Sequence, residues 1–111
     1  MDINNSAPCD IKTAMCILGN KWTALIIREL ADDAKRFGQL EKSISGLNPR
    51  TLSKRLDELE NERIIKSCSD GGSHNHRCYT LTDKGRDLLP ILQSMARWGE
   101  KYPASTPQNI A

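Results

Sequence analysis

This 111-residue sequence contains no segment typical of a membrane-spanning helix or of a targeting peptide. No apolar run approaches the roughly 20 residues that a membrane-spanning helix needs, so we expect no membrane protein. The first ten residues, MDINNSAPCD, carry neither a basic stretch nor an apolar stretch, so they lack the marks of a signal or transit peptide. We therefore expect a protein that works in the cytoplasm.

Motifs of catalysis are missing as well. The sequence contains no glycine-rich phosphate loop and no serine, histidine and aspartate placed by a known motif. We therefore expect neither an enzyme nor a bound cofactor. Large net charge is also absent: the total is +2, which neither demands nor excludes nucleic acid as a partner. The distribution of the charges has to decide that question.

What the sequence contains is typical of one compact domain. Its length fits a single hydrophobic core, and hydrophobic residues at 38% with charged residues at 27% are ordinary for a globular protein. Four cysteines occur in a chain without a secretion signal. We interpret them as thiols rather than as a disulfide framework, because the cytosol keeps such groups reduced.

Apolar residues recur at helical spacing in five stretches of the chain. The first stretch, after Asp10, places Ile11, Met15 and Leu18 on one face and stops near Gly19. The second stretch begins at Lys21, and the third is GQLEKSI. The fourth is NPRTLSKRLDELENE, and the fifth follows Thr82. We expect the last helix to bury more apolar surface than one side of a small domain needs. These apolar residues are Leu88, Leu89, Ile91, Leu92, Met95 and Trp98.

Two short runs of strand-forming residues, IIKSCS and HRCYTLT, flank the turn formers DGGSHN. They predict a β-hairpin with a flexible tip. The predicted fold is therefore mainly α with a small β-hairpin, in the element order of a winged helix-turn-helix.

The clearest predicted helix covers residues 48–62. An asparagine at the cap and a proline at the first helical position mark its start. Its leucines share one face, while Arg50 and Lys54 point the opposite way. Three cations and no anion stand between Asn48 and Leu56, whereas four carboxylates follow in residues 57–62. One helix thus has a basic N-terminal end and an acidic C-terminal end.

This polarity suits a helix that enters the major groove of DNA with its N-terminal end. Base edges and phosphates then meet basic side chains, unpaired backbone N–H groups and the positive end of the helix dipole. The predicted DNA contacts in the helix are Asn48, Arg50, Thr51, Ser53, Lys54 and Arg55. The alternative is a solvated face whose cations pair with the acidic turn. The hairpin favours DNA, and the predicted contacts of this wing and its flank are Arg36, Ser73, His74, His76 and Arg77.

A metal site is the alternative function for the hairpin. Cys68, His74, His76 and Cys78 would be the ligands of a metal-responsive regulator or metal-binding protein. Zinc needs four converging ligands, and the spacing C-x5-H-x-H-x-C matches no common closed site. We therefore expect a wing first, a thiol pair of Cys68 and Cys78 second, and a metal site third, so no residue is assigned as a metal ligand.

The segments CDIKTAMCILGNKWTALIIREL, KRFGQLEKSISGLNPRTLSKRLDELENERII and CYTLTDKGRDLLPILQSMARWGEK resemble the HxlR-type transcriptional regulators, relatives of the MarR group. The resemblance implies a homodimer held by the first and last helices, bound to a pseudo-palindromic operator in double-stranded DNA. The surplus apolar residues of the last helix fit such an interface. We expect a flexible arm over residues 1–8, a winged helix domain for DNA binding and dimerisation over 9–102, and a flexible tail over 103–111.

The same resemblance implies a sensor of oxidants or small electrophiles at Cys9. A thiol near a helix N-terminus is favoured as the reactive thiolate, although Asp10 beside it acts in the opposite direction. The alternative is a small apolar side chain packed at the helix start. Cys16 lies about 10 Å further along the helix axis, too far from Cys9 for a disulfide, and we expect a half-buried thiol there.

Overall fold

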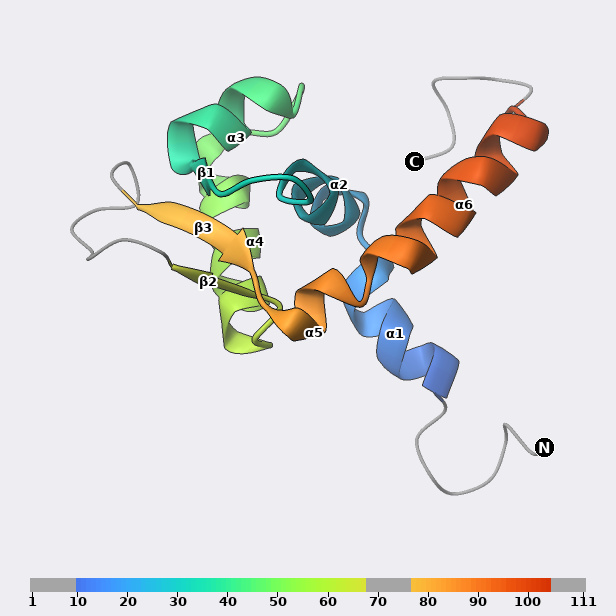
Figure 1. The fold of residues 1–111 in the computed structure, drawn as a ribbon. Helices are drawn as coiled ribbons and strands as arrows, with labels where there is room; N and C mark the ends of the chain where they lie inside the picture. The colour runs from blue at the N-terminus through green and yellow to red at the C-terminus, as the bar shows by residue number, and fades with distance from the viewer. Residues whose placement is uncertain (1–9, 68–76, 105–111) are drawn as a thin grey trace.

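A computed structural model describes residues 10–67 and 77–104 of the chain, and the described part is mainly helical with a small antiparallel sheet (Figure 1). The elements are α1 (Asp10–Leu18), α2 (Lys21–Glu29), β1 (Lys35–Arg36), α3 (Phe37–Ser43), α4 (Pro49–Asn61), β2 (Ile65–Ser67), β3 (Cys78–Leu81), α5 (Asp83–Arg86) and α6 (Leu89–Lys101). The predicted arm over residues 1–8 and most of the predicted tail lie outside the described residues. None of the described helices is long and apolar enough to cross a membrane.

The sheet has the strand order β1-β3-β2, with both pairings antiparallel. Ile65 pairs with Leu81 and Ser67 pairs with Tyr79, so the predicted pairing of the two hairpin runs is confirmed. The sequence analysis missed β1, whose Lys35 pairs with Tyr79. This strand has two residues, which is too short for a periodic pattern, and it exists only through its partner β3.

The core lies between one face of the sheet and the helices α2, α3 and α4. The leucines that predicted the inner face of α4 are buried, and so are Ile65, Tyr79 and Leu81 on the facing side of the sheet. Figure 1 shows α4 behind the sheet, and it shows α1 and α6 extending on the side opposite the hairpin. The hairpin and the two terminal helices are therefore free to make separate contacts.

The prediction of one long helix after Thr82 is wrong. Thr82 caps the four-residue helix α5, whose Gly85 N–H donates to the Thr82 hydroxyl, and α6 begins only at Leu89. Pro90 explains the break, because its ring has no N–H and would collide with the carbonyl of Arg86 in a continuous helix.

Gly85 packs against the turn that joins α4 to β2, and replacing it with alanine tests this contact. A Cβ at this position would stand 2.2 Å from the Ile64 carbonyl oxygen and 3.1 Å from a Leu81 methyl group. We expect Gly85→Ala to lower the free energy of unfolding by about 3 kcal/mol in urea denaturation, because backbone atoms have to move.

Gly38→Ala is the matched control, because a Cβ on this α3 glycine meets no atom within 4 Å. We expect the control to keep or raise the free energy of unfolding by up to about 1 kcal/mol, through its better helix propensity. Equal stability of the two variants would contradict the close contact at Gly85.

Candidate nucleic-acid interface

The N-terminus of α4 is built as the sequence predicts. Asn48 has extended backbone angles, and its side-chain oxygen accepts a hydrogen bond from the Thr51 N–H at 2.9 Å. Pro49 follows as the first helical residue, where no N–H is required. The helix therefore starts at a fixed point, where Asn48 caps the Thr51 N–H and its carbonyl accepts from the Leu52 N–H.

The outer face of α4 carries the predicted cations. Arg50 and Lys54 are exposed, whereas Thr51 and Ser53 beside them are half-buried. A shallow groove of about 620 Å³ follows this face. Its lining residues are Pro49, Arg50, Ser53, Lys54, Asp57, Glu58 and Asn61. The groove thus combines a basic end with the acidic residues of the second half of the helix.

The three cations of α4 differ in their partners. Arg55 forms an ion pair with Glu58, with 2.7 Å between Nη1 and Oε1, and its side chain is only 23% exposed. Within the described residues, Arg50 and Lys54 form no ion pair. The alternative of pairing with the acidic turn therefore holds for Arg55, and the other two cations remain available to a ligand.

The flank of the hairpin contributes two further cations. Arg36 is exposed in β1, and its N–H donates to the Gln39 side-chain oxygen at 2.8 Å, which fixes the start of α3. Arg77 lies 3.7 Å from Glu60 on α4 and so links the hairpin to that helix. The predicted contacts Ser73, His74 and His76 lie outside the described residues.

Tyr79 holds the middle strand in the core rather than serving the surface. Its side chain is fully buried, and its hydroxyl has no hydrogen-bond partner among the described residues. Burial raises the pKa of the Tyr79 hydroxyl, and the nearby Arg77 guanidinium opposes part of that increase. The tyrosine is therefore a neutral packing residue at physiological pH.

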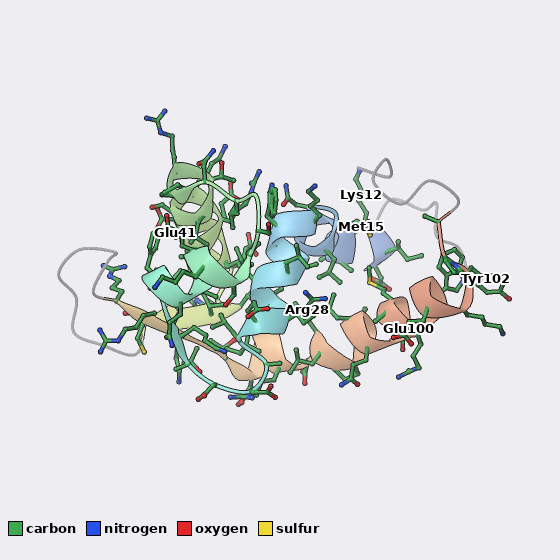
Figure 2. The ribbon with its side chains drawn as sticks, turned by 90° about the horizontal axis from the view of Figure 1, so that it is seen from above. Lys12, Met15, Arg28, Glu41, Glu100 and Tyr102 are labelled. Carbon is green, nitrogen blue, oxygen red and sulfur yellow. The ribbon has the colours of Figure 1, made fainter. Side chains whose placement is uncertain are left out.

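A second surface lies on the terminal helices. We call it the apolar face, and it consists of Ile11, Met15, Ile91, Met95, Trp98 and Tyr102. The prediction that α6 buries Ile91, Met95 and Trp98 is wrong for the single chain, because Met95 is 50% and Trp98 66% exposed. Only Leu88, Leu89 and Leu92 pack against the core. Figure 2 shows Met15 of α1 and Tyr102 after α6 on the same side of the molecule.

The family follows from comparison with known proteins. Residues 17–107 match the HxlR-like helix-turn-helix family. The chain belongs to this family. Its mainly helical fold with a small antiparallel sheet, which includes the predicted hairpin strands β2 and β3, is that of a winged helix-turn-helix regulator.

Relatives of the chain are transcriptional regulators, not enzymes. The uncharacterized HTH-type transcriptional regulator YvaP of Bacillus subtilis (strain 168) is 36% identical over 101 residues, which cover 90% of this chain and 94% of YvaP. The crystal structure of quinone-bound YodB from B. subtilis has a TM-score of 0.73 at 31% identity and covers 86% of this chain and all of that one. A putative MarR-family transcriptional regulator of Porphyromonas gingivalis W83 has a TM-score of 0.81 at 28% identity, with 92% and 99% covered. This chain is accordingly an HxlR-type transcriptional regulator.

The cysteines of this HxlR-like chain occupy three different situations. Cys9 and Cys68 lie outside the described residues. Cys16 is a free thiol, but it is exposed rather than half-buried as predicted. Cys78 is disulfide-bonded, so the interpretation of all four cysteines as thiols is wrong. Pairing of β3 with β1 places Cys78 opposite Arg36.

The metal alternative gains no support from Cys78. A disulfide sulfur is not the thiolate that zinc requires. Residues 10–67 and 77–104 contain no cluster of three or more metal-ligating side chains. The other three predicted ligands, Cys68, His74 and His76, lie outside that part of the chain.

Proposed function

We propose that this HxlR-type regulator binds a pseudo-palindromic operator as a homodimer, with α4 of each subunit in the major groove. The observation that carries the proposal is the N-terminal end of α4, where Arg50 and Lys54 are exposed and unpaired within the described residues. Arginine can contact guanine with two hydrogen bonds, and lysine can contact guanine or phosphate. Arg36 beside the wing would add a phosphate contact.

The acidic half of α4 sets how the helix meets the duplex. Four carboxylates stand between residues 57 and 62, and they would be repelled by phosphates if the helix lay flat along the groove. Only the N-terminal end can approach closely. This orientation also brings the positive end of the helix dipole toward the phosphates.

The apolar face supports the homodimer. Ile11 and Met15 of α1 and Ile91, Met95 and Trp98 of α6 are too many large exposed hydrophobic side chains for scattered surface positions. Exposed tryptophan and methionine are enriched at the centres of protein interfaces. A two-fold axis through this face would place two α4 helices about 34 Å apart, one turn of B-DNA, if the dimer is to read two half-sites.

A thiol response at Cys9 is the proposed control. The relative YodB, whose structure is quinone-bound, supports a small electrophile as effector. Addition of the Cys9 thiolate to a quinone ring carbon would form a C–S bond and break the π bond of the ring C=C; the electron pair moves to a quinone oxygen, which takes up a proton. Cys9 directly precedes α1, which carries part of the apolar face, so modification would shift the subunits and the spacing of the recognition helices.

Charge removal on α4 tests the DNA contact. We expect Arg50→Ala and Lys54→Ala each to weaken operator binding by about 10- to 100-fold. For Lys54→Ala, the slope of log K against log salt concentration should also become shallower, by the amount that one lost phosphate contact causes. Fluorescence anisotropy with a labelled operator duplex measures both quantities. Arg28→Ala is the matched control, because Arg28 is exposed on α2 and lies on the side of α6 in Figure 2. Unchanged affinity in both α4 variants would refute the assignment of these residues.

A charge on the apolar face tests the dimer. We expect Trp98→Glu to convert the protein to a monomer at micromolar concentration in analytical ultracentrifugation, because a carboxylate cannot be buried there without a partner. Gln93→Glu is the control, since Gln93 is exposed on the opposite side of α6 and the dimer should persist. A dimeric Trp98→Glu variant would place the interface elsewhere.

Substitution of Cys9 tests the thiol response. We expect a quinone or a mild oxidant to change the operator affinity of the wild type and to leave Cys9→Ser unaffected in a mobility-shift assay, because only a thiolate reacts. Cys16→Ser should keep the wild-type response. A response that survives in Cys9→Ser and vanishes in Cys16→Ser would move the sensor to the exposed thiol of α1.

A further inference from the structure

A basic groove lies at the base of the hairpin. Figure 1 shows β3 running into α5 at this point. Its volume is about 670 Å³. The lining residues are Arg63, Lys66, Thr80, Leu81, Thr82, Asp83, Lys84 and Arg86, which are four cations and one carboxylate among eight residues. Neither the DNA contacts proposed above nor the apolar face includes any of them.

The basic groove opens on the side of the sheet that faces away from α4. Ile65 and Leu81 are paired in the register and buried toward the helices. Lys66 and Thr80 are the adjacent pair, so their side chains project from the opposite face of the sheet. A duplex seated on the outer face of α4 therefore lies on the other side of the sheet from these cations.

The walls of the groove are tied together by hydrogen bonds. The Thr82 hydroxyl donates to the Arg63 and Ile64 carbonyls and accepts from the Gly85 N–H. The Lys84 ammonium donates to the Glu62 carbonyl at 2.8 Å. These bonds hold the turn after α4, the end of β3 and the start of α5 in one arrangement, so a ligand has little ordering cost to overcome.

Arg63 has an unusual backbone. Its φ of 62° is in the left-handed region, and it is the one non-glycine residue with positive φ in the described residues. Glycine adopts this conformation without strain, whereas a residue with a Cβ does not. A long cationic side chain kept at a strained position in the wall of a basic groove points to a role for that side chain.

We infer that the basic groove binds a small ligand with two or more phosphate groups, held by Arg63, Lys66, Lys84 and Arg86. Guanidinium and ammonium groups are the side chains that match phosphate oxygens, and four of them suit more than one negative charge. The volume is in the range of small-ligand sites, about 300–1,000 Å³. Asp83 offers an acceptor to a ligand hydroxyl, as in a sugar or nucleoside diphosphate.

An acidic protein segment fits the groove less well. Protein interfaces depend on apolar and aromatic anchors in buried pockets. Leu81 is the one large apolar lining residue, and it is 3% exposed, so it offers almost no apolar surface. Recognition in this groove is accordingly electrostatic. A bound diphosphate would join the α4–β2 turn to α5 and thereby stiffen the link between the wing and α6.

Calorimetric titration of the full chain with inorganic pyrophosphate and with ADP, at an ionic strength of about 0.15 M, tests the inference. We expect Arg63→Gly to weaken binding at least tenfold through the loss of a charge-assisted contact, while the melting temperature of the ligand-free protein does not fall. Relief of the left-handed strain offsets the greater chain entropy of glycine. Arg86→Gln should weaken binding similarly without a backbone change.

Arg28→Gln is the matched control, because it removes an exposed cation outside the groove. Binding that falls equally in the control would mean general charge attraction and would overturn the site, as would the absence of binding to the wild type. Operator affinity should be unchanged in Arg63→Gly; a loss there would assign the groove to DNA and overturn the small-ligand inference. The titration uses no DNA, so its result is independent of the proposed operator binding.

Discussion

The burial of one face of α4 is the constraint on which the rest of the structure depends. Leu52, Leu56 and Leu59 are at most 2% exposed, and each such burial stabilises the fold by about 1.5–3 kcal/mol. Because rotation of the helix about its axis would expose these leucines, the direction of Arg50 and Lys54 is fixed by the core. The same burial holds the sheet against α4 and so decides which face of the hairpin looks outward. Packing of the core thus fixes the orientation of the outer face of α4 and of the outer face of the hairpin, although neither face is part of the core.

Charge is distributed along α4 in a way that the net charge of +2 conceals. The basic end and the acidic end nearly cancel in the total, yet they lie at opposite ends of one helix. Arg55 has a structural role, because it forms an ion pair with Glu58, whereas Arg50 and Lys54 are exposed. Arg77 similarly approaches Glu60 and keeps the hairpin beside the helix. A protein can therefore offer a basic end to a duplex and remain almost neutral overall.

The sequence was most informative where the signals are local. The asparagine cap, the proline and the leucine spacing of α4 lie within a few residues of one another, and the structure has all three as predicted. The break between α5 and α6 was also visible in the sequence, since Pro90 forbids a continuous helix. Strand β1 and the basic groove could not be predicted, because both depend on the register of β3 with distant segments. The left-handed Arg63 has no sequence signal, as an arginine does not mark that conformation.

The junction at Thr82 and Gly85 connects the surfaces that the molecule presents. Thr82 binds the carbonyls of the turn after α4, and Gly85 sits under the Ile64 carbonyl with no room for a side chain. This junction therefore joins the end of α4 to α5, and α5 leads directly into α6. In a dimer formed through α6, the distance between two recognition helices is set by this short connection. If such a dimer reads two half-sites about 34 Å apart, as proposed, a rigid junction keeps the two α4 helices at that spacing and a loose one would not.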